Sequence, residues 1–311
     1  MIRIVIILLT VCLANICQVS SHQPEFDHCI VLAEQSQHSI IVINVESHQI
    51  IWQWDAKNKD INPDFCKWFN SPSDAKVIDN GRYILITASG GGVALIRIPD
   101  KKVVFYAYAG GNTHSAEILP DGNIVCASST GNYLSLFRTD TTNYPIGVYC
   151  KKIPNKFGHN VVWDNKRKVL WCTAMDYLIT YRYNFNKDQP DLTRIDSIKI
   201  PGNQAHDLFP VHGEDALWLT TIDHVFKFAI PSGKFHEIEL ADGQNIKSIS
   251  SGPETYPVII LRPKEKWWTD EIFDIHNNSI FCEKGYKIYK VRWFVPNTFS
   301  YGEPNMKVSG K

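Results

Sequence analysis

The sequence repeats one pattern of two strands at regular intervals, and this repetition constrains the fold more than any other feature. The segments THSAEILPDGNIVCAS, GHNVVWDNKRKVLWCTA and AHDLFPVHGEDALWLTT each read as a small residue, a histidine, an apolar strand, a polar turn and a second apolar strand. The segments SDAKVIDNGRYILITAS and NIKSISSGPETYPVIILR follow this plan without the histidine. The repeat marks are 40, 45, 47 and 41 residues apart, at Asp74, His114, His159, His206 and Lys247. A period of about 40 to 50 residues built from short strands is typical of β-propeller blades.

The second repeat shows the whole unit. Short runs rich in β-branched and aromatic residues alternate with turns, and helical periodicity is nearly absent. These runs predict an inner strand near residues 75–78, followed by strands at 83–87, 93–98 and 103–108.

The two ends of the chain complement each other. Residues 29–56 match the last three strands of a blade, and we expect residues 286–295 to supply the missing inner strand. The sequence therefore predicts an all-β, six-bladed propeller whose ring is closed by N- and C-terminal strands. Residues 262–285 read either as two short strands or as a long insertion, so five or seven blades remain open.

The N-terminus predicts export. Residues 1–21 contain an arginine, an apolar stretch at 4–16 that is short for a membrane span, and then small residues, which is the order of a secretory signal peptide. A lipoprotein signal at Cys17 is the alternative, although Ile16 is larger than the residue that usually precedes such a cysteine. We expect a secreted or periplasmic protein with a single propeller domain over residues 22–311.

Charge and hydropathy limit the partners. The chain has 32 basic and 32 acidic side chains and a pI near 7.1, so no overall field attracts nucleic acid. No later segment has 18 consecutive apolar residues, which argues against a membrane span. We expect a monomer that binds a small molecule or an oligosaccharide and no nucleic acid.

Six cysteines follow the signal peptide, and export permits disulfides. Cys126 and Cys172 lie at matching places inside apolar strands, which predicts small buried hydrophobic residues. Cys29 and Cys282 lie near the two ends of the mature chain, and we hypothesise a disulfide that joins them.

The repeated histidine is the candidate functional feature. Inner strands surround the axis of a propeller, so we expect His114, His159 and His206 to meet at one mouth of the channel. Three neutral imidazoles suit Zn²⁺ or Mn²⁺, with Gln204, Asp207 or water completing the coordination. Such a metal would acidify a substrate proton or a water, which would make the three histidines both ligands and catalytic residues. Without a metal, an anion would meet protonated histidines and Lys247.

A structural role is the alternative to a functional one. A residue repeated in each blade can cap the inner strand or join adjacent blades by hydrogen bonds. The histidine is absent from the second and sixth repeats, where Asp74 and Lys247 take its place. A mixed ring of this kind favours a functional role, either metal binding and catalysis or ligand binding, over a purely structural one.

Other candidate binding residues lie in the connections. Trp68 lies in a connection that leads to the axis, and Arg262 follows an inner strand where it would meet an acidic ligand. Trp267 and Trp268 suit stacking on sugars or packing between blades.

Three segments carry a family resemblance. TASGGGVALI, NTHSAEILPDGNIVCASSTGN and the closing YKVRWF resemble an uncharacterised family of secreted, six-bladed propellers found mainly in Bacteroidetes-type bacteria. The similarity covers most of the mature chain and implies a fold and export, with no settled activity. The placement of histidine in successive blades is more distantly similar to arylsulfotransferases and to metal-dependent lyases that act on uronate sugars.

These observations together predict that an axial histidine cluster recognises an acidic saccharide or another anionic small molecule. Metal-assisted processing by a lyase or hydrolase-type reaction is left open. The alternatives are a non-catalytic binding module that uses the same pocket, and a scaffold whose loops hold a protein partner.

Overall fold

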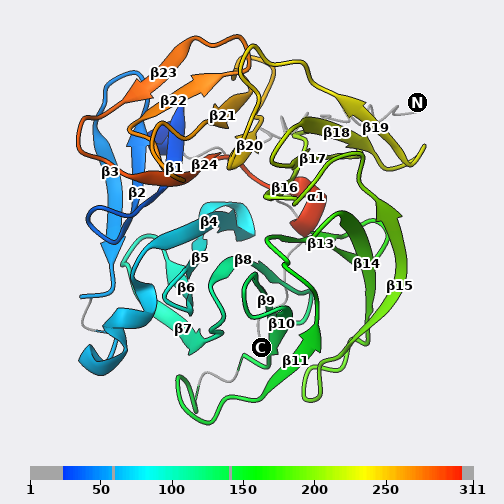
Figure 1. Cartoon of the computed structure of the whole chain (residues 1–311). Coiled ribbons are helices and arrows are strands. Elements are labelled where there is room, and N and C mark those ends of the chain that lie inside the picture. Colours follow the sequence, from blue (N-terminus) through cyan, green and yellow to red (C-terminus); the bar gives the residue numbers. More distant parts are fainter. Residues whose placement is uncertain (1–23, 58–59, 140–141, 303–311) are drawn as a thin grey trace, which may run out of the picture.

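A ring of six four-stranded antiparallel sheets forms the molecule (Figure 1). The computed structural model describes residues 24–57, 60–139 and 142–302. The predicted signal peptide, 1–21, and the alternative lipid site at Cys17 lie outside the described residues. The prediction of a six-bladed all-β propeller is confirmed.

In each of the first three blades, four strands pair in sequence from the inner strand at the axis to the outer strand. Blade 1 contains β24 (Ile288–Trp293), β1 (Cys29–Glu34), β2 (Ser39–Asn44) and β3 (Ile50–Asp55). Blade 2 contains β4 (Pro72–Ile78), β5 (Tyr83–Ala88), β6 (Gly92–Arg97) and β7 (Val103–Tyr108). Blade 3 contains β8 (Thr113–Ile118), β9 (Ile124–Ser128), β10 (Tyr133–Phe137) and β11 (Cys150–Pro154).

The other three blades repeat this order. Blade 4 contains β12 (Val161–Asp164), β13 (Val169–Ala174), β14 (Tyr177–Tyr183) and β15 (Leu192–Lys199). Blade 5 contains β16 (Asp207–Pro210), β17 (Ala216–Thr220), β18 (Val225–Ala229) and β19 (Lys234–Glu237). Blade 6 contains β20 (Ser248–Ser250), β21 (Ile259–Leu261), β22 (Glu271–Asp274) and β23 (Ser279–Cys282).

Blades 1 and 6 answer the two questions that the sequence left open. The last strand, β24, pairs with the first, β1, so that Ile30 lies opposite Trp293 and the ring is closed by both chain ends as predicted. The ambiguous segment 262–285 contributes the two short strands β22 and β23 to blade 6.

The hydrophobic core lies between adjacent blades. Each of six apolar clusters in the described residues joins one blade to the next; that between blades 3 and 4, for example, contains Leu134 and Trp163. A sheet covered on both faces needs apolar residues on both faces, which explains the continuous apolar runs in the inner strands. Cys126 and Cys172 are fully buried, which confirms their prediction as small hydrophobic residues.

The predicted disulfide between Cys29 and Cys282 is wrong, because both cysteines are free. Cys29 is fully buried at the start of β1, where its thiol contacts the backbone oxygens of Glu25 and Asp27. Cys282 is exposed at the end of the outer strand β23. The ends of the chain are joined instead by the hydrogen bonds between β1 and β24.

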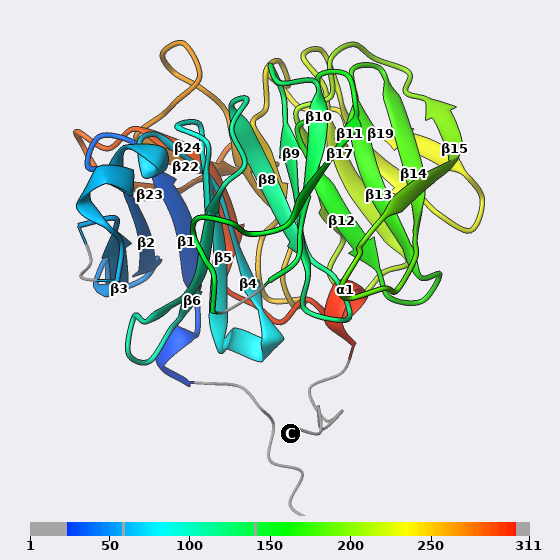
Figure 2. The same cartoon turned by 90° about the horizontal axis from the view of Figure 1, so that it is seen from below.

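The C-terminal segment lies at one end of the channel. The short helix α1 (Thr298–Tyr301) lies at the lower end of the molecule in Figure 2, beneath the inner strands. The Tyr301 hydroxyl donates a hydrogen bond to the carboxylate of Glu117 on β8, and the Phe299 carbonyl accepts one from Asn165 after β12.

The other helices of the described residues are short 3₁₀ helices: η1 (Pro24–Phe26), η2 (Pro63–Phe69) and η3 (Asp79–Gly81). No helix in the described parts of the chain is long enough and apolar enough to span a bilayer.

Candidate functional site

β-bulges at the start of the inner strands place side chains at the upper mouth of the channel. In blade 3, Thr113 pairs with Ser128 and Ser115 pairs with Ala127, which leaves His114 as the extra residue. In blade 1, Tyr289 is the extra residue of β24. A bulge bends the strand and redirects the side chain of the extra residue, and both extra residues line the pocket at the mouth.

Blades 5 and 6 show the same irregularity. The His206 backbone N–H donates to the Thr220 carbonyl at 2.8 Å, although Asp207 is the residue that pairs with Thr220. The Lys247 N–H donates to Leu261 at 2.9 Å in the same way. We call His114, His159, His206, Lys247 and Tyr289, which come from five blades, the mouth residues.

The strand pairing of blade 2 changes which of its residues corresponds to the repeated histidine. Asp74 pairs with Thr87 after a bulge at Ser73, so Ser73 corresponds to His114 and Asp74 corresponds to Ser115. The sequence alignment placed Asp74 at the position of the histidine, one residue too late. A bulge changes which residue faces the axis without changing the spacing of apolar residues, so the spacing could not reveal it.

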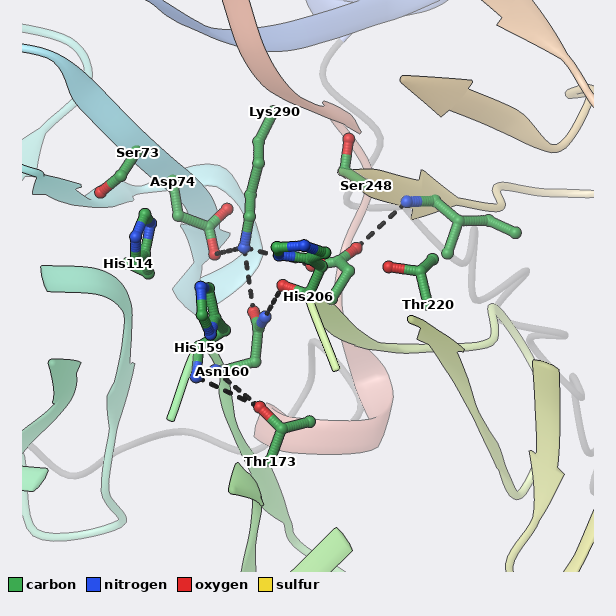
Figure 3. A network of polar contacts seen from close by, with 12 residues as sticks. Ser73, Asp74, His114, His159, Asn160, Thr173, His206, Thr220, Ser248 and Lys290 are labelled. Carbon is green, nitrogen blue, oxygen red and sulfur yellow. Dashed lines mark hydrogen bonds and ion pairs between the residues drawn. The ribbon is translucent and has the colours of Figure 1, made fainter. Parts of the chain in front are cut away.

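The structure brings the three histidines together from adjacent blades (Figure 3). The imidazoles of His114 and His159 are stacked with centroids 4.6 Å apart, and those of His159 and His206 meet edge to face at 5.1 Å. His114 Nδ1 lies 3.2 Å from the Tyr289 hydroxyl, and His159 Nδ1 lies 3.1 Å from the Phe157 carbonyl oxygen.

A pocket of about 400 Å³ lies above these rings. Most of its lining residues carry polar groups, two of them are the large aromatic residues Trp267 and Tyr289, and none carries a carboxylate. They are Gln35, Ser71, Ser89, Asn112, His114, His159, His206, Lys247, Trp267 and Tyr289.

Burial keeps the histidines uncharged. It lowers the pKa of His114 well below its usual value, with His159 and Lys290 adding repulsion. Burial also lowers the pKa of His159 to about 3 and that of His206 to about 2, the latter with help from Lys247. The expectation that protonated histidines meet an anion is therefore corrected, because at neutral pH the imidazoles are neutral.

Lys247 is the cation of the pocket. Its side chain is buried, and its Nζ lies 3.1 Å from His206 Nε2. Burial and, to a smaller extent, repulsion from the nearby Lys290 lower the pKa of Lys247 to about 8. No ion pair among the described residues joins Lys247 to a carboxylate.

Beneath the mouth lies a charged layer that is almost sealed from solvent. Arg292 contacts both carboxylate oxygens of Asp207 at 2.6 Å, and Lys290 lies 3.2 Å from Asp207 and 3.6 Å from Asp74. We call Asp74, Asp207, Lys290 and Arg292 the ion-pair layer. Burial alone would raise the pKa of Asp74, but Lys290 and Arg292 lower it to about 2.

Charge is balanced within this part of the channel. The ion-pair layer holds two acids and two bases, and Lys76 pairs with Glu117 at 3.3 Å further down. Asn160 links the layer to the mouth, because its side chain accepts from Lys290 at 3.2 Å and donates to the His206 carbonyl at 2.7 Å (Figure 3). Within the part of the chain that the structure describes, the ammonium of Lys247 contacts His206 and has no carboxylate partner of its own.

Several predicted binding residues lie elsewhere. Asp74 and Asp207 belong to the ion-pair layer beneath the pocket. Gln204 lies before β16, with its backbone N–H bonded to Asp176. The structure thus places all three outside the lining of the pocket.

Trp68 and Arg262 also lie outside this lining. Trp68 stacks on Phe65 at 4.1 Å within η2 and contacts Tyr108 of the outer strand β7. The Arg262 guanidinium bonds to Asn277 at 2.6 Å and covers the ring of Phe273.

The sequence reasoning missed Tyr289 and the polar rim residues Gln35, Ser71, Ser89 and Asn112. Tyr289 had a usable signal, because YKVRW in the closing strand occupies the place of HSAEI in blade 3. Charged Lys290 and Arg292 in an otherwise apolar inner strand also indicate a polar channel. The rim residues are in turns and carried no comparable signal.

Metal coordination requires several donors directed at one point. Within residues 24–57, 60–139 and 142–302, no group of three or more His, Cys, Asp or Glu side chains is arranged to hold a metal ion. His114 and His159 stack face to face, and the ammonium of Lys247 lies beside Nε2 of His206. The binding of Zn²⁺ or Mn²⁺ by His114, His159 and His206 stays a prediction.

Comparison with solved structures finds propellers at low sequence identity. A protein of unknown function from Bacteroides caccae is 13% identical with a TM-score of 0.56, over 85% of this chain and 97% of that one. The periplasmic gluconolactonase of Pseudomonas aeruginosa is 13% identical with a TM-score of 0.55, over 82% and 79%. A catalytically inactive virginiamycin B lyase from Staphylococcus aureus, with quinupristin, is 14% identical with a TM-score of 0.52, over 84% of each chain. These similarities show the fold alone.

Sequence comparisons place the chain in a family. No curated protein matches it. The expectation of an uncharacterised propeller family is confirmed, while the likeness to arylsulfotransferases stays a prediction. The model of DUF6528, described as a family of unknown function, matches residues 2–310, and the chain therefore belongs to this family.

Proposed function

We propose that this protein binds an anionic small molecule in the axial pocket, and that the ligand is an acidic saccharide. One observation carries the proposal: the buried ammonium of Lys247 faces a pocket without carboxylates and contacts a neutral imidazole. A buried charge without a partner is costly, and a carboxylate or sulfate from a ligand would supply that partner.

The remaining walls suit the hydroxyl groups of a sugar. Hydroxyl and amide side chains line the rim at Ser71, Ser89, Asn112 and Gln35, and each can donate and accept hydrogen bonds. Trp267 adds an exposed aromatic face of the kind that packs against sugar rings. We also propose that the protein is exported and meets this ligand outside the cytoplasm, in keeping with the signal-like sequence of residues 1–21.

The local charge favours an anion over a metal ion. A divalent cation at the three imidazoles would be repelled by Lys247, and it would compete with the Lys247 ammonium for Nε2 of His206. Elemental analysis of the purified protein tests this preference. One equivalent of firmly bound zinc or manganese, lost on mutation of His159, would contradict it.

Replacing Lys247 by methionine should weaken binding of glucuronate by about 30-fold or more, because a charge-assisted contact in a buried site is lost. Isothermal titration of wild-type protein with glucuronate and with neutral glucose measures the contribution of the carboxylate. Methionine has a similar volume, so the thermal midpoint reports whether the fold is kept.

The exposed Lys234 on β19 provides the matched control, since Lys234→Met removes one positive charge away from the pocket. This variant should bind glucuronate as the wild type does. Equal binding of glucose and glucuronate by the wild type, or equal loss in both variants, would reject the proposal.

Lyase activity on a uronate is the second candidate, favoured by the lowered pKa of Lys247. An amine with a pKa of about 8 can act as a general base on a proton next to a carboxylate. In this function the neutral amine of Lys247 takes the proton from the carbon next to the carboxylate, the bond from the sugar to the glycosidic oxygen breaks as the double bond forms, and the Tyr289 hydroxyl beside His114 protonates the leaving oxygen. An unsaturated product that absorbs in the ultraviolet would show turnover, whereas unchanged oligouronate after prolonged incubation would leave binding alone.

A further inference from the structure

The pocket has a single entrance. Directly beneath the mouth residues, the side chains of Asp207, Lys290 and Asp74 are 0, 1 and 2% exposed, so the channel is filled at that level. At the opposite end, α1 lies beneath the inner strands and is held there by the contact of Tyr301 with Glu117 (Figure 2). A polymer therefore cannot thread through the propeller, which favours the entry of a chain end over that of a continuous chain.

Trp267 forms part of the wall at this entrance. It lies between β21 and β22, and the residue is 48% exposed. Tryptophan side chains are highly buried on average in folded proteins, so this exposure leaves an unusually large aromatic surface open to a ligand. Its Nε1 donates to Gln35 Oε1 at 3.0 Å, and Gln35 Nε2 donates to the Pro72 carbonyl at 3.0 Å. These two bonds fix the orientation of the ring before any ligand arrives, which reduces the entropy lost on stacking.

Lys247 and Trp267 line the same pocket, so one ligand can contact both. Building on the proposed function, we propose that the site recognises the end of an acidic oligosaccharide. The terminal acidic ring lies beside Lys247, and the next ring stacks on Trp267. Rings beyond the second project into solvent and contribute little to the affinity.

Titration with oligogalacturonates of one to four rings tests this arrangement. Affinity should rise about five- to tenfold from one ring to two, which is the contribution expected of one aromatic contact, and then stay constant for three and four rings. In Trp267→Ala the gain from the second ring should disappear, so that one ring and two rings bind with equal affinity. Trp267→Phe should keep most of the gain.

The matched control is Tyr177→Ala, which removes an exposed aromatic side chain on β14 outside the pocket. It should bind every oligomer as the wild type does. Blocking one end of the trimer, either by reduction at the reducing end or by methylation at the other, should weaken binding about tenfold or more at one end only.

The outcomes separate this inference from the proposed function. Affinity that keeps rising to four rings, or trimers that bind equally well with either end blocked, would overturn recognition of a chain end while leaving the anion site intact. Normal binding of the single ring with no effect of Trp267→Ala on two rings would overturn the stacking subsite. Absence of binding to every oligomer, including galacturonate itself, would overturn the proposed function for uronates.

Discussion

Replacing Asp207 by alanine should lower the free energy of unfolding by about 3 to 5 kcal/mol, the range typical of removing one partner from a buried ion pair. Asp207 accepts two hydrogen bonds from Arg292 and pairs with Lys290, and it is completely buried. The variant leaves two cations facing Asp74 alone, so the charge balance of the channel is lost. Equilibrium urea denaturation measures the difference.

Asp100→Ala is the matched control, because Asp100 pairs with Arg97 on the surface. Exposed pairs contribute little to stability, so this variant should unfold nearly as the wild type does. If Asp207→Ala lowered the free energy of unfolding by less than about 1 kcal/mol, the result would contradict the role of the ion-pair layer in stability. Such a small change is typical of an exposed ion pair. Asp207→Asn, which keeps the shape and removes the charge, separates electrostatics from packing.

Acidification should destabilise the fold before the carboxylates titrate. An imidazole in the unfolded chain takes up a proton near pH 6.5, whereas burial lowers the pKa of His159 to about 3 and that of His114 well below its usual value. Between these values the unfolded state binds more protons, so the free energy of unfolding falls as the pH falls. Two such histidines contribute about 3 kcal/mol per pH unit together.

Urea denaturation at constant ionic strength between pH 6.5 and 4.5 checks this slope. Asp74 and Asp207 also have lowered pKa values, but these carboxylates take up protons at more acidic pH and change the stability little in this window. The double variant His114→Gln, His159→Gln should flatten the slope by most of that amount. A wild-type stability that is constant over this range would contradict the burial of neutral imidazoles.

The repeat period and the apolar runs were sufficient to predict the ring. Pairing of β24 with β1 followed from a first blade that lacked an inner strand, and the buried Cys126 and Cys172 followed from their apolar neighbours. The burial of these cysteines depends on the local composition of their strands, and the pairing of β24 with β1 depends on the repeat that closes the ring. A single sequence contains both kinds of information.

The chemistry of the site depended on details that the period does not contain. A bulge decides that Ser73 rather than Asp74 corresponds to His114, and this places Asp74 in the ion-pair layer. The protonation of the histidines depends on burial and on the nearby Lys290, which comes from the other end of the chain. Likewise, Trp267 and Gln35 are far apart in sequence and meet only because blades 6 and 1 are adjacent.

The crystal structure of the protein with digalacturonate tests the central claim, the binding of an anion beside Lys247, most directly. We predict one carboxylate within hydrogen-bonding distance of Lys247 Nζ and the second sugar ring on the face of Trp267. A saccharide bound at another surface, or a metal ion coordinated by His114, His159 and His206 with the carboxylate as its ligand, would contradict the account.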